Sequence, residues 1–108
     1  MSTPPDATGA IHTIAGALLT IGNDSAAVAE ILRTYGCRGI ANNPADNPLT
    51  NFLARYGVRE PEVAWNGRGY VCQSNAYEHE VCVPLPDPVA MFMAQFDAGQ
   101  WPNLAVNS

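Results

Sequence analysis

The spacing of apolar residues changes between Tyr56 and Val63, and this change constrains the fold more than any other feature. Before it, apolar residues recur every three or four positions, which is the period of an amphipathic helix. From Glu62 to Leu85 they largely alternate with other residues, which is the period of a β-strand. A chain of 108 residues is about one domain long. The sequence therefore predicts a single α+β domain over residues 1–108, with residues 1–6 as a flexible N-terminus.

Four helical segments are predicted, at residues 7–21, 24–35, 48–56 and 88–98. Asp6, Asp24, Asn47 and Asp87 stand where an N-cap side chain accepts hydrogen bonds from free amides, and a glycine follows each segment closely. The expected buried faces are Ile11, Ile14, Ala15, Leu18, Leu19 and Ile21; Val28, Ile31, Leu32 and Tyr35; Leu49, Phe52, Leu53 and Tyr56; and Val89, Phe92, Met93 and Phe96. After the last helix, Trp101 and Leu104 are expected to fold back on the body.

Three strands are predicted at residues 62–65, 68–73 and 79–85, joined as an antiparallel meander that packs against the helices. Asn66-Gly67 suits the positive dihedral angles of a two-residue type I′ turn. Such a turn places Trp65 opposite Arg68 and Val63 opposite Tyr70. Val63, Trp65 and Tyr70 would then share one face of the hairpin.

Charge and composition exclude several classes of function. The chain has five arginines, no lysine and ten acidic residues, for a net charge of −5, which disfavours general binding of nucleic acid. No apolar run approaches the roughly 18 residues of a membrane span. The N-terminus carries an acidic residue and no basic one, unlike a secretory signal. Three cysteines, an odd number, fit reduced thiols. We therefore expect a cytoplasmic protein.

Three segments, AVAEILRTYGCRG, NPLTNFLARYGV and LPDPVAMFMAQFDAGQWPNL, together resemble a family of small actinobacterial or actinophage proteins. Its members share a helix that ends in a glycine-rich loop, a Pro-Leu helix, a hairpin and a C-terminal Leu-Pro-x-Pro-Val…Phe-Asp-x-Gly helix. The resemblance covers residues 26–104. Many members carry a cysteine where this chain has Asn47, so no role of that thiol carries over. The family has no established activity, so the resemblance implies a fold and a kind of source only.

Cysteine and histidine offer one candidate chemistry. Cys72, His79 and Cys82 lie on neighbouring predicted strands and their turn, and Cys37 is a fourth possible zinc ligand. Their spacing matches no common structural zinc pattern, and the favoured interpretation is that Cys72 and Cys82 are small apolar strand residues and His79 a solvated turn residue. A disulfide between Cys72 and Cys82 is a further alternative. A small metal-binding or redox protein is thus one hypothesis, although we predict no metal site.

Groups for acid–base or nucleophilic catalysis are sparse. His12 lies on the first predicted helix, far along the chain from the other histidine, and no nucleophile motif accompanies either. The acidic pairs Glu60/Glu62 and Glu78/Glu80 are expected to be solvated. The sequence therefore predicts no catalytic residue and no cofactor, and we expect a protein that is not an enzyme.

Binding is the remaining function, and its predicted residues are Arg55, Arg59, Trp65, Arg68 and Tyr70. All five arginines lie within residues 33–68, which makes this part mildly basic in an acidic chain. Aromatic residues beside arginine are frequent energetic centres of protein interfaces. We therefore predict an interaction or regulatory protein, monomeric or homodimeric, that binds another protein.

The same residues allow a second hypothesis, a nucleic-acid-binding domain of the winged-helix kind. Three helices followed by a hairpin is the element order of that fold. The third helix would enter the major groove while the Asn66-Gly67 tip lies along phosphates. The acidic net charge and the absence of lysine disfavour this alternative.

Overall fold

The computed structural model describes residues 7–106. The elements follow in the order α1 (Ala7–Thr20), α2 (Ser25–Thr34), α3 (Pro48–Arg55), β1 (Glu62–Trp65), β2 (Tyr70–Ser74), β3 (Val81–Pro84), α4 (Asp87–Asp97) and a 3-10 turn, η1 (Pro102–Leu104). The predicted α+β class is confirmed, as is the antiparallel meander in the order β1-β2-β3. The predicted Asp6 cap and flexible segment 1–6 lie outside the described residues.

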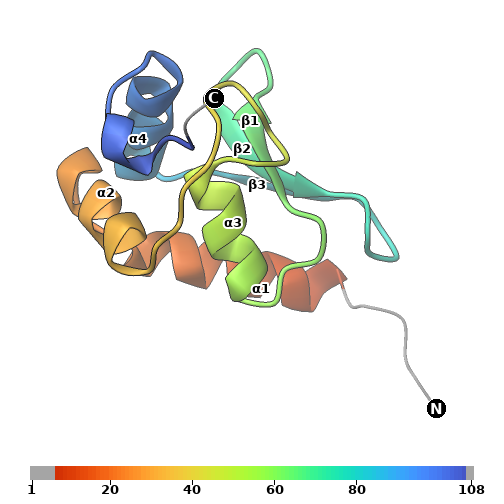
Figure 1. The fold of residues 1–108 in the computed structure, drawn as a ribbon. Coiled ribbons are helices and arrows are strands. Elements are labelled where there is room, and N and C mark those ends of the chain that lie inside the picture. The colour runs from red at the N-terminus through yellow and green to blue at the C-terminus, as the bar shows by residue number, and fades with distance from the viewer. Residues whose placement is uncertain (1–6, 107–108) are drawn as a thin grey trace.

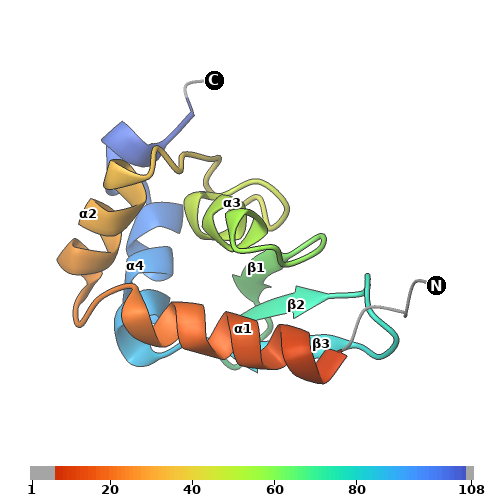
Figure 2. The ribbon, with the colours of Figure 1, turned by 90° about the horizontal axis from the view of Figure 1, so that it is seen from below.

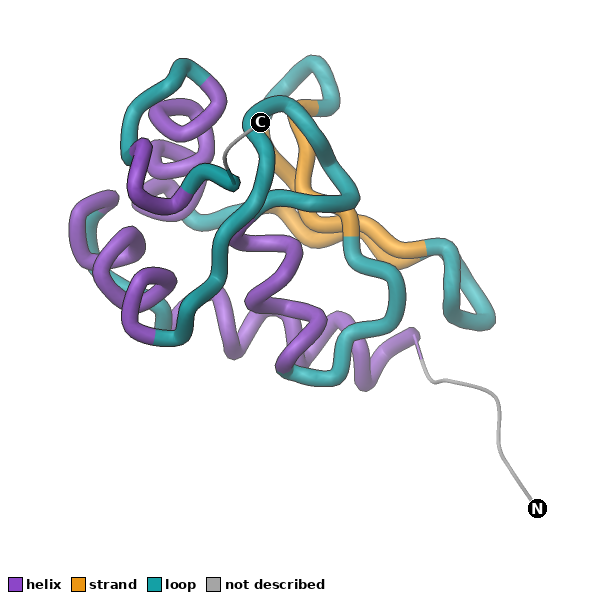
Figure 3. Tube along the Cα trace, in the orientation of Figure 1, coloured by secondary structure: helices purple, strands orange, loops and turns teal. Residues whose placement is uncertain are grey.

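The helices gather on one side of the sheet (Figures 1 and 2). α1 runs along β3, α3 lies against β1, and α4 contacts both β2 and α2. The tube in Figure 3 shows that long loops link these elements on the side of α3 and β1. Among the helices described, none has the length and apolar content to cross a membrane.

The sheet turns one face toward the helices. Val63 pairs with Cys72, and Cys72 pairs with Val83, so these three side chains share a face, and all three are buried. Cys82 and Pro84 point to the opposite face of β3 and are exposed. The core therefore sits between the helical layer and one face of the sheet, as the change of period predicted.

Two predicted caps are confirmed, and one is wrong. The side chains of Asp24 and Asn47 accept hydrogen bonds from the main chain three residues on, each at 2.8 Å. α4 instead begins at Asp87, and its N-cap is Pro86, whose carbonyl accepts the N–H groups of both Val89 and Ala90. Asp87 is thus inside the first turn, where its charge favours the helix dipole without a capping bond.

Several side chains predicted to be buried are exposed. Tyr35 is 55% exposed and Tyr56 is 51% exposed, and each is the C-cap of its helix rather than part of its buried face. Both rings still pack on the buried ring of Phe52. On α1, Ile11 and Leu19 are exposed because only a narrow stripe of that helix meets the core.

The hairpin register differs from the prediction by two residues. Trp65 pairs with Tyr70 rather than with Arg68, so the loop has four residues instead of two. Asn66 closes this longer loop: its side chain accepts the N–H groups of Arg68 and Gly69, and its own N–H binds the Gly69 carbonyl. A shift of two leaves every strand side chain on its predicted face, since faces repeat every two residues.

The chain after α4 returns to the body, as predicted. Leu104 is buried, and the half-buried Trp101 lies against Phe92 with ring centroids 6.3 Å apart. Ala105 then forms a parallel bridge with Gly39. Gly39 also lies against α3 so closely that a Cβ atom on it would come within 2.3 Å of the Asn47 Cα.

Candidate functional site

Three of the five predicted binding residues meet at the hairpin. Trp65 ends β1, Tyr70 begins β2, and Arg68 lies in the loop between them. The rings of Trp65 and Tyr70 meet edge to face, with centroids 5.6 Å apart and planes inclined by 70°. Trp65 is 60% exposed, Arg68 is exposed and Tyr70 is half-buried. We call this group the hairpin site.

The other two predicted residues lie elsewhere. Arg59 is held near the far end of β2: its carbonyl accepts the hydroxyl of Ser74 at 2.6 Å, and Ser74 is four residues, about 13 Å, from Tyr70. Arg55 ends α3 and donates a hydrogen bond to the Tyr35 carbonyl. Figure 1 shows that the carboxyl end of α3 points toward α1, away from the hairpin loop. The structure therefore does not bring all five residues together.

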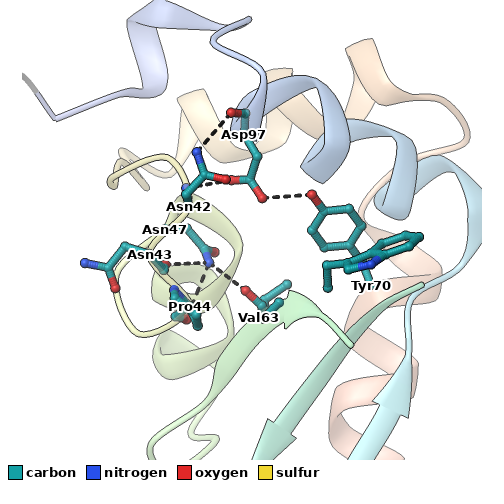
Figure 4. A pocket seen from close by; sticks show the side chains of 9 residues that line it. Asn42, Asn43, Pro44, Asn47, Val63, Tyr70 and Asp97 are labelled. Atoms are coloured by element: carbon teal, nitrogen blue, oxygen red, sulfur yellow. Dashed lines mark hydrogen bonds between the residues drawn. The ribbon is translucent and has the colours of Figure 1, made fainter. Parts of the chain in front are cut away.

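A pocket of about 220 Å³ opens beside the hairpin site (Figure 4). It lies between the loop of residues 42–47, the end of β1, the ring of Tyr70 and the last residue of α4. Its lining residues are Asn42, Asn43, Pro44, Asn47, Val63, Ala64, Trp65, Tyr70 and Asp97.

Asp97 joins the walls of this pocket. One carboxylate oxygen accepts the Tyr70 hydroxyl at 2.8 Å, and the other accepts the Asn42 main-chain N–H at 2.9 Å. The Asn42 side chain donates in turn to the Asp97 carbonyl at 3.2 Å. Burial, and then the hydrogen bond and charge of Asp97, raise the pKa of Tyr70 to about 12. The phenol thus stays protonated and donates to the carboxylate at physiological pH.

The carboxylate of Asp97 has no cationic partner within residues 7–106. The salt bridge found in this part of the chain joins Arg33 to Glu30 on the surface of α2. Asp97 is half-buried, and its two recorded partners are neutral donors. The pocket therefore holds a negative charge that the described residues do not neutralise.

The floor of the pocket is held by a buried asparagine. The Asn47 side chain donates to the carbonyls of Val63 and Asn43, each at 3.0 Å, while its oxygen caps α3. The Val63 N–H binds the Pro44 carbonyl and the Thr50 hydroxyl, both at 3.1 Å. These bonds attach the loop to the outer edge of β1, so the pocket wall is part of the folded body.

Several groups on the pocket have no recorded partner among the described residues. The indole N–H of Trp65 and the side-chain NH₂ of Asn43 appear in no hydrogen bond of residues 7–106, whereas the other tryptophan, Trp101, donates to Gln95. The exposed face of Trp65 adds an apolar surface beside them. The pocket thus offers an aromatic face, amide groups and a carboxylate together.

The cysteines do not come together in the disulfide or zinc arrangements considered as alternatives from the sequence. Cys72 and Cys82 occupy successive register positions, so they point to opposite faces of the sheet, and no disulfide joins them. Burial raises the pKa of the Cys72 thiol to about 12 and also raises that of Cys37, which keeps both protonated and unreactive. Over residues 7–106 no three His, Cys, Asp or Glu side chains come close enough to hold a metal ion.

The third helix is poorly placed to enter a nucleic-acid groove. α3 has eight residues, and five of them are buried: Pro48, Leu49, Thr50, Phe52 and Leu53. A recognition helix must present a face of side chains to the base edges. α3 instead uses most of its surface to connect α2 with β1.

Asp97 and Asn42 were not predicted as site residues. In the sequence, Asp97 is only a polar residue near the end of the last predicted helix, and Asn42 lies in a loop of turn-forming residues. They meet across 55 positions of the chain, and no local pattern reports a contact of that range. Asn42 does show a structural hint, a positive φ of 61°, which asparagine tolerates better than most residues.

No protein-family model matches the chain, and no curated protein or solved structure is significantly similar to it. The resemblance to small actinobacterial proteins therefore stays a prediction. The function has to be inferred from the hairpin site and its pocket.

Proposed function

We propose that this chain is a non-enzymatic regulatory protein of the cytoplasm that binds another protein through the hairpin site. The observation that carries the proposal is the exposure of Trp65, at 60%, beside the fixed ring of Tyr70. An aromatic side chain of this size gains strongly from burial, and Trp, Tyr and Arg are the residues most often found at the energetic centre of interfaces.

The hairpin site is largely organised before any partner arrives. Tyr70 is held by its hydroxyl bond to Asp97 and by the pairing of β1 with β2. The Trp65 ring rests edge-on against it, and Asn66 fixes the loop that carries Arg68. Because binding costs free energy for every side chain that must be ordered, a preformed aromatic pair lowers that cost.

The surface around the hairpin is hollowed on both sides of Tyr70. Beyond the pocket at Asp97, a second hollow of about 400 Å³ lies between the hairpin loop and the start of α4. Its lining residues are Asn66, Arg68, Gly69, Tyr70, Val71, Pro84, Leu85, Asp87 and Ala90. A partner that covers the hairpin would thus find a recess on each side, which favours specific packing over a flat contact.

Site-specific photo-crosslinking in the cells that encode the protein tests this proposal. Trp65 is replaced by p-benzoylphenylalanine, and in a matched control Leu19, which is 71% exposed on α1, is replaced in the same way. We expect one discrete adduct from position 65 that position 19 does not give. With the identified partner purified, Trp65→Ala should weaken binding at least about thirtyfold, the usual effect of removing a central interface residue.

Two results would overturn the proposal. One is the absence of any adduct from position 65, or the same set of adducts from positions 65 and 19. The other is a partner whose affinity is unchanged by Trp65→Ala.

A further inference from the structure

We propose that the pocket beside Trp65 receives one basic side chain of the partner protein, with arginine preferred over lysine. This inference rests on the proposed function, because it names the part of the partner that the hairpin site recognises. It follows from the charge of the pocket, its aromatic walls, its hydrogen-bonding groups and its size.

The negative charge of the pocket favours a cationic ligand. Asp97 contributes a carboxylate, and the lining residues include no arginine or histidine. Arg68, the nearest cationic side chain along the hairpin, lines the hollow on the other side of Tyr70. The net charge of −5 of the chain adds a long-range attraction for a basic partner.

The two aromatic rings favour the same ligand. Trp65 and Tyr70 stand at 70° to each other at one side of the pocket, and the Trp65 ring is open to solvent. A cation within about 6 Å of a ring centroid is attracted by the π electrons, most strongly for tryptophan, and arginine makes this contact more often than lysine.

The hydrogen-bond acceptors of the pocket match a guanidinium, whereas the N–H groups of Trp65 and Asn43, which are donors, do not bond to it. Each oxygen of Asp97 accepts one recorded bond, and a carboxylate oxygen accepts two. The acceptor sites that remain, together with the side-chain oxygen of Asn42, can accept bonds from an arginine guanidinium, which has five N–H donors in a planar fork and no acceptor. Lysine presents only three donors at one point, so it would satisfy the same acceptors less completely.

The size of the pocket suits a single side chain. A cavity of about 150 Å³ is large enough to bind benzene. The 220 Å³ here therefore accommodates one large side chain rather than a longer segment.

Other occupants fit less well. An acidic or phosphorylated side chain would be repelled by Asp97. An aliphatic one would strip water from a carboxylate without replacing its interactions, which is costly.

A pair of matched peptides tests the inference by NMR titration of the ¹⁵N-labelled protein. One is acetyl-Gly-Ser-Arg-Ser-Gly-amide, and the other carries citrulline, which has the same shape without the charge, in place of arginine. We expect saturable shifts of the Trp65 indole and the Asn42 and Asn43 side-chain amides at millimolar arginine peptide. The citrulline peptide should bind at least about tenfold more weakly, and high salt should reduce the difference.

Three variants sharpen the titration. Trp65→Ala should abolish the saturable shifts, while Met91→Ala, at another exposed apolar position on α4, should leave them unchanged. Asp97→Asn keeps the size of the side chain and removes its charge, so the preference for arginine over citrulline should vanish.

The inference is overturned if the citrulline peptide binds as tightly as the arginine peptide, or if neither produces a saturable shift at these side chains. Shifts that survive Trp65→Ala would overturn it as well. Failure here is distinct from failure of the proposed function: a crosslinked partner that binds through Trp65 without a basic side chain removes only the preference for a cation. If the arginine peptide binds but position 65 yields no adduct, the proposed protein partner is contradicted and the preference of the pocket for a cation is not.

Discussion

Two regions of this molecule gather aromatic rings next to an arginine, and they differ in what the rings pack against. At the hairpin site, Trp65 and Tyr70 stand beside an open pocket that contains a carboxylate. At the carboxyl ends of α2 and α3, the exposed rings of Tyr35 and Tyr56 flank the ring of Phe52, which is 4% exposed. The rings of the second group therefore pack around a buried ring, whereas those of the first border an open pocket.

The arginines differ in the same way. Arg55 donates to the Tyr35 main-chain carbonyl, so its guanidinium helps to join the ends of α3 and α2. Arg68 is exposed, and none of its side-chain nitrogens has a recorded partner within residues 7–106. Composition alone therefore does not distinguish a candidate binding surface from a packed one. Polar and aromatic groups that the fold leaves without partners identify it better.

Truncating one ring in each region should give the largest contrast. Phe52→Ala removes a buried ring that contacts two others, so we expect it to lower the free energy of unfolding by about 3–5 kcal/mol. Trp65→Ala removes an exposed ring and should cost no more than about 1 kcal/mol. Urea denaturation measures both. Equal losses would show that Trp65 stabilises the fold and would weaken its assignment to binding.

A substitution in the pocket floor should lower the free energy of unfolding nearly as much as Phe52→Ala. Asn47→Ala removes the cap of α3 and leaves buried carbonyls without donors, with an expected loss of about 3 kcal/mol. The control is Asn43→Ala, whose side chain accepts one bond from Ala45 in the same loop and should cost under about 1 kcal/mol. A small effect of Asn47→Ala would mean that the loop is held by other contacts.

Removing the Tyr70 hydroxyl should destabilise the pocket wall more than the core. Tyr70→Phe keeps the ring against Trp65 and deletes the bond to Asp97, for an expected loss of about 1 kcal/mol. Amide exchange should accelerate at Asn42, which shares that carboxylate, more than at Val28 in the core. Uniform acceleration at both amides would contradict a local role.

Alkaline pH should give an effect with a defined sign. The folded-state pKa of Tyr70, about 12, lies above its ordinary value of 10, so the folded chain retains this proton after the unfolded chain has lost it. The free energy of unfolding therefore falls between pH 10 and 12. Tyr70→Phe lacks this contribution, so its deficit relative to the wild type should shrink over that range. A constant difference between the two proteins would contradict the raised pKa.

Much of the fold was predictable because its signals are local. The caps at Asp24 and Asn47, the glycines after helices and the alternation in the strands each depend on a few neighbouring residues. The hairpin register was not, because the bonds that Asn66 makes within the loop decide between two and four loop residues. The exposure of Tyr35 and Tyr56 was also not predicted, because periodicity identifies the buried face of a helix but not the residue at which burial ends.

The candidate site was predictable only in part. Trp65, Arg68 and Tyr70 are close in sequence, so the hairpin brings them together wherever its register falls. Arg55 and Arg59 were grouped with them by charge, but Arg55 ends α3 beside Tyr35, and Arg59 lies near the far end of β2. The carboxylate of the pocket comes from the end of another helix, and only the packing of α4 beside β2 places it there.

The close approach of Gly39 to Asn47 has a consequence for how this protein can diverge. A side chain at position 39 would strike the main chain of position 47, whatever residue stands there. We therefore expect selection to retain the glycine at 39, while the intervening loop, which borders the proposed binding pocket, can vary. When homologues are aligned, we expect an invariant column at 39 beside a variable stretch, a record of selection acting on shape at one position and on recognition at the others.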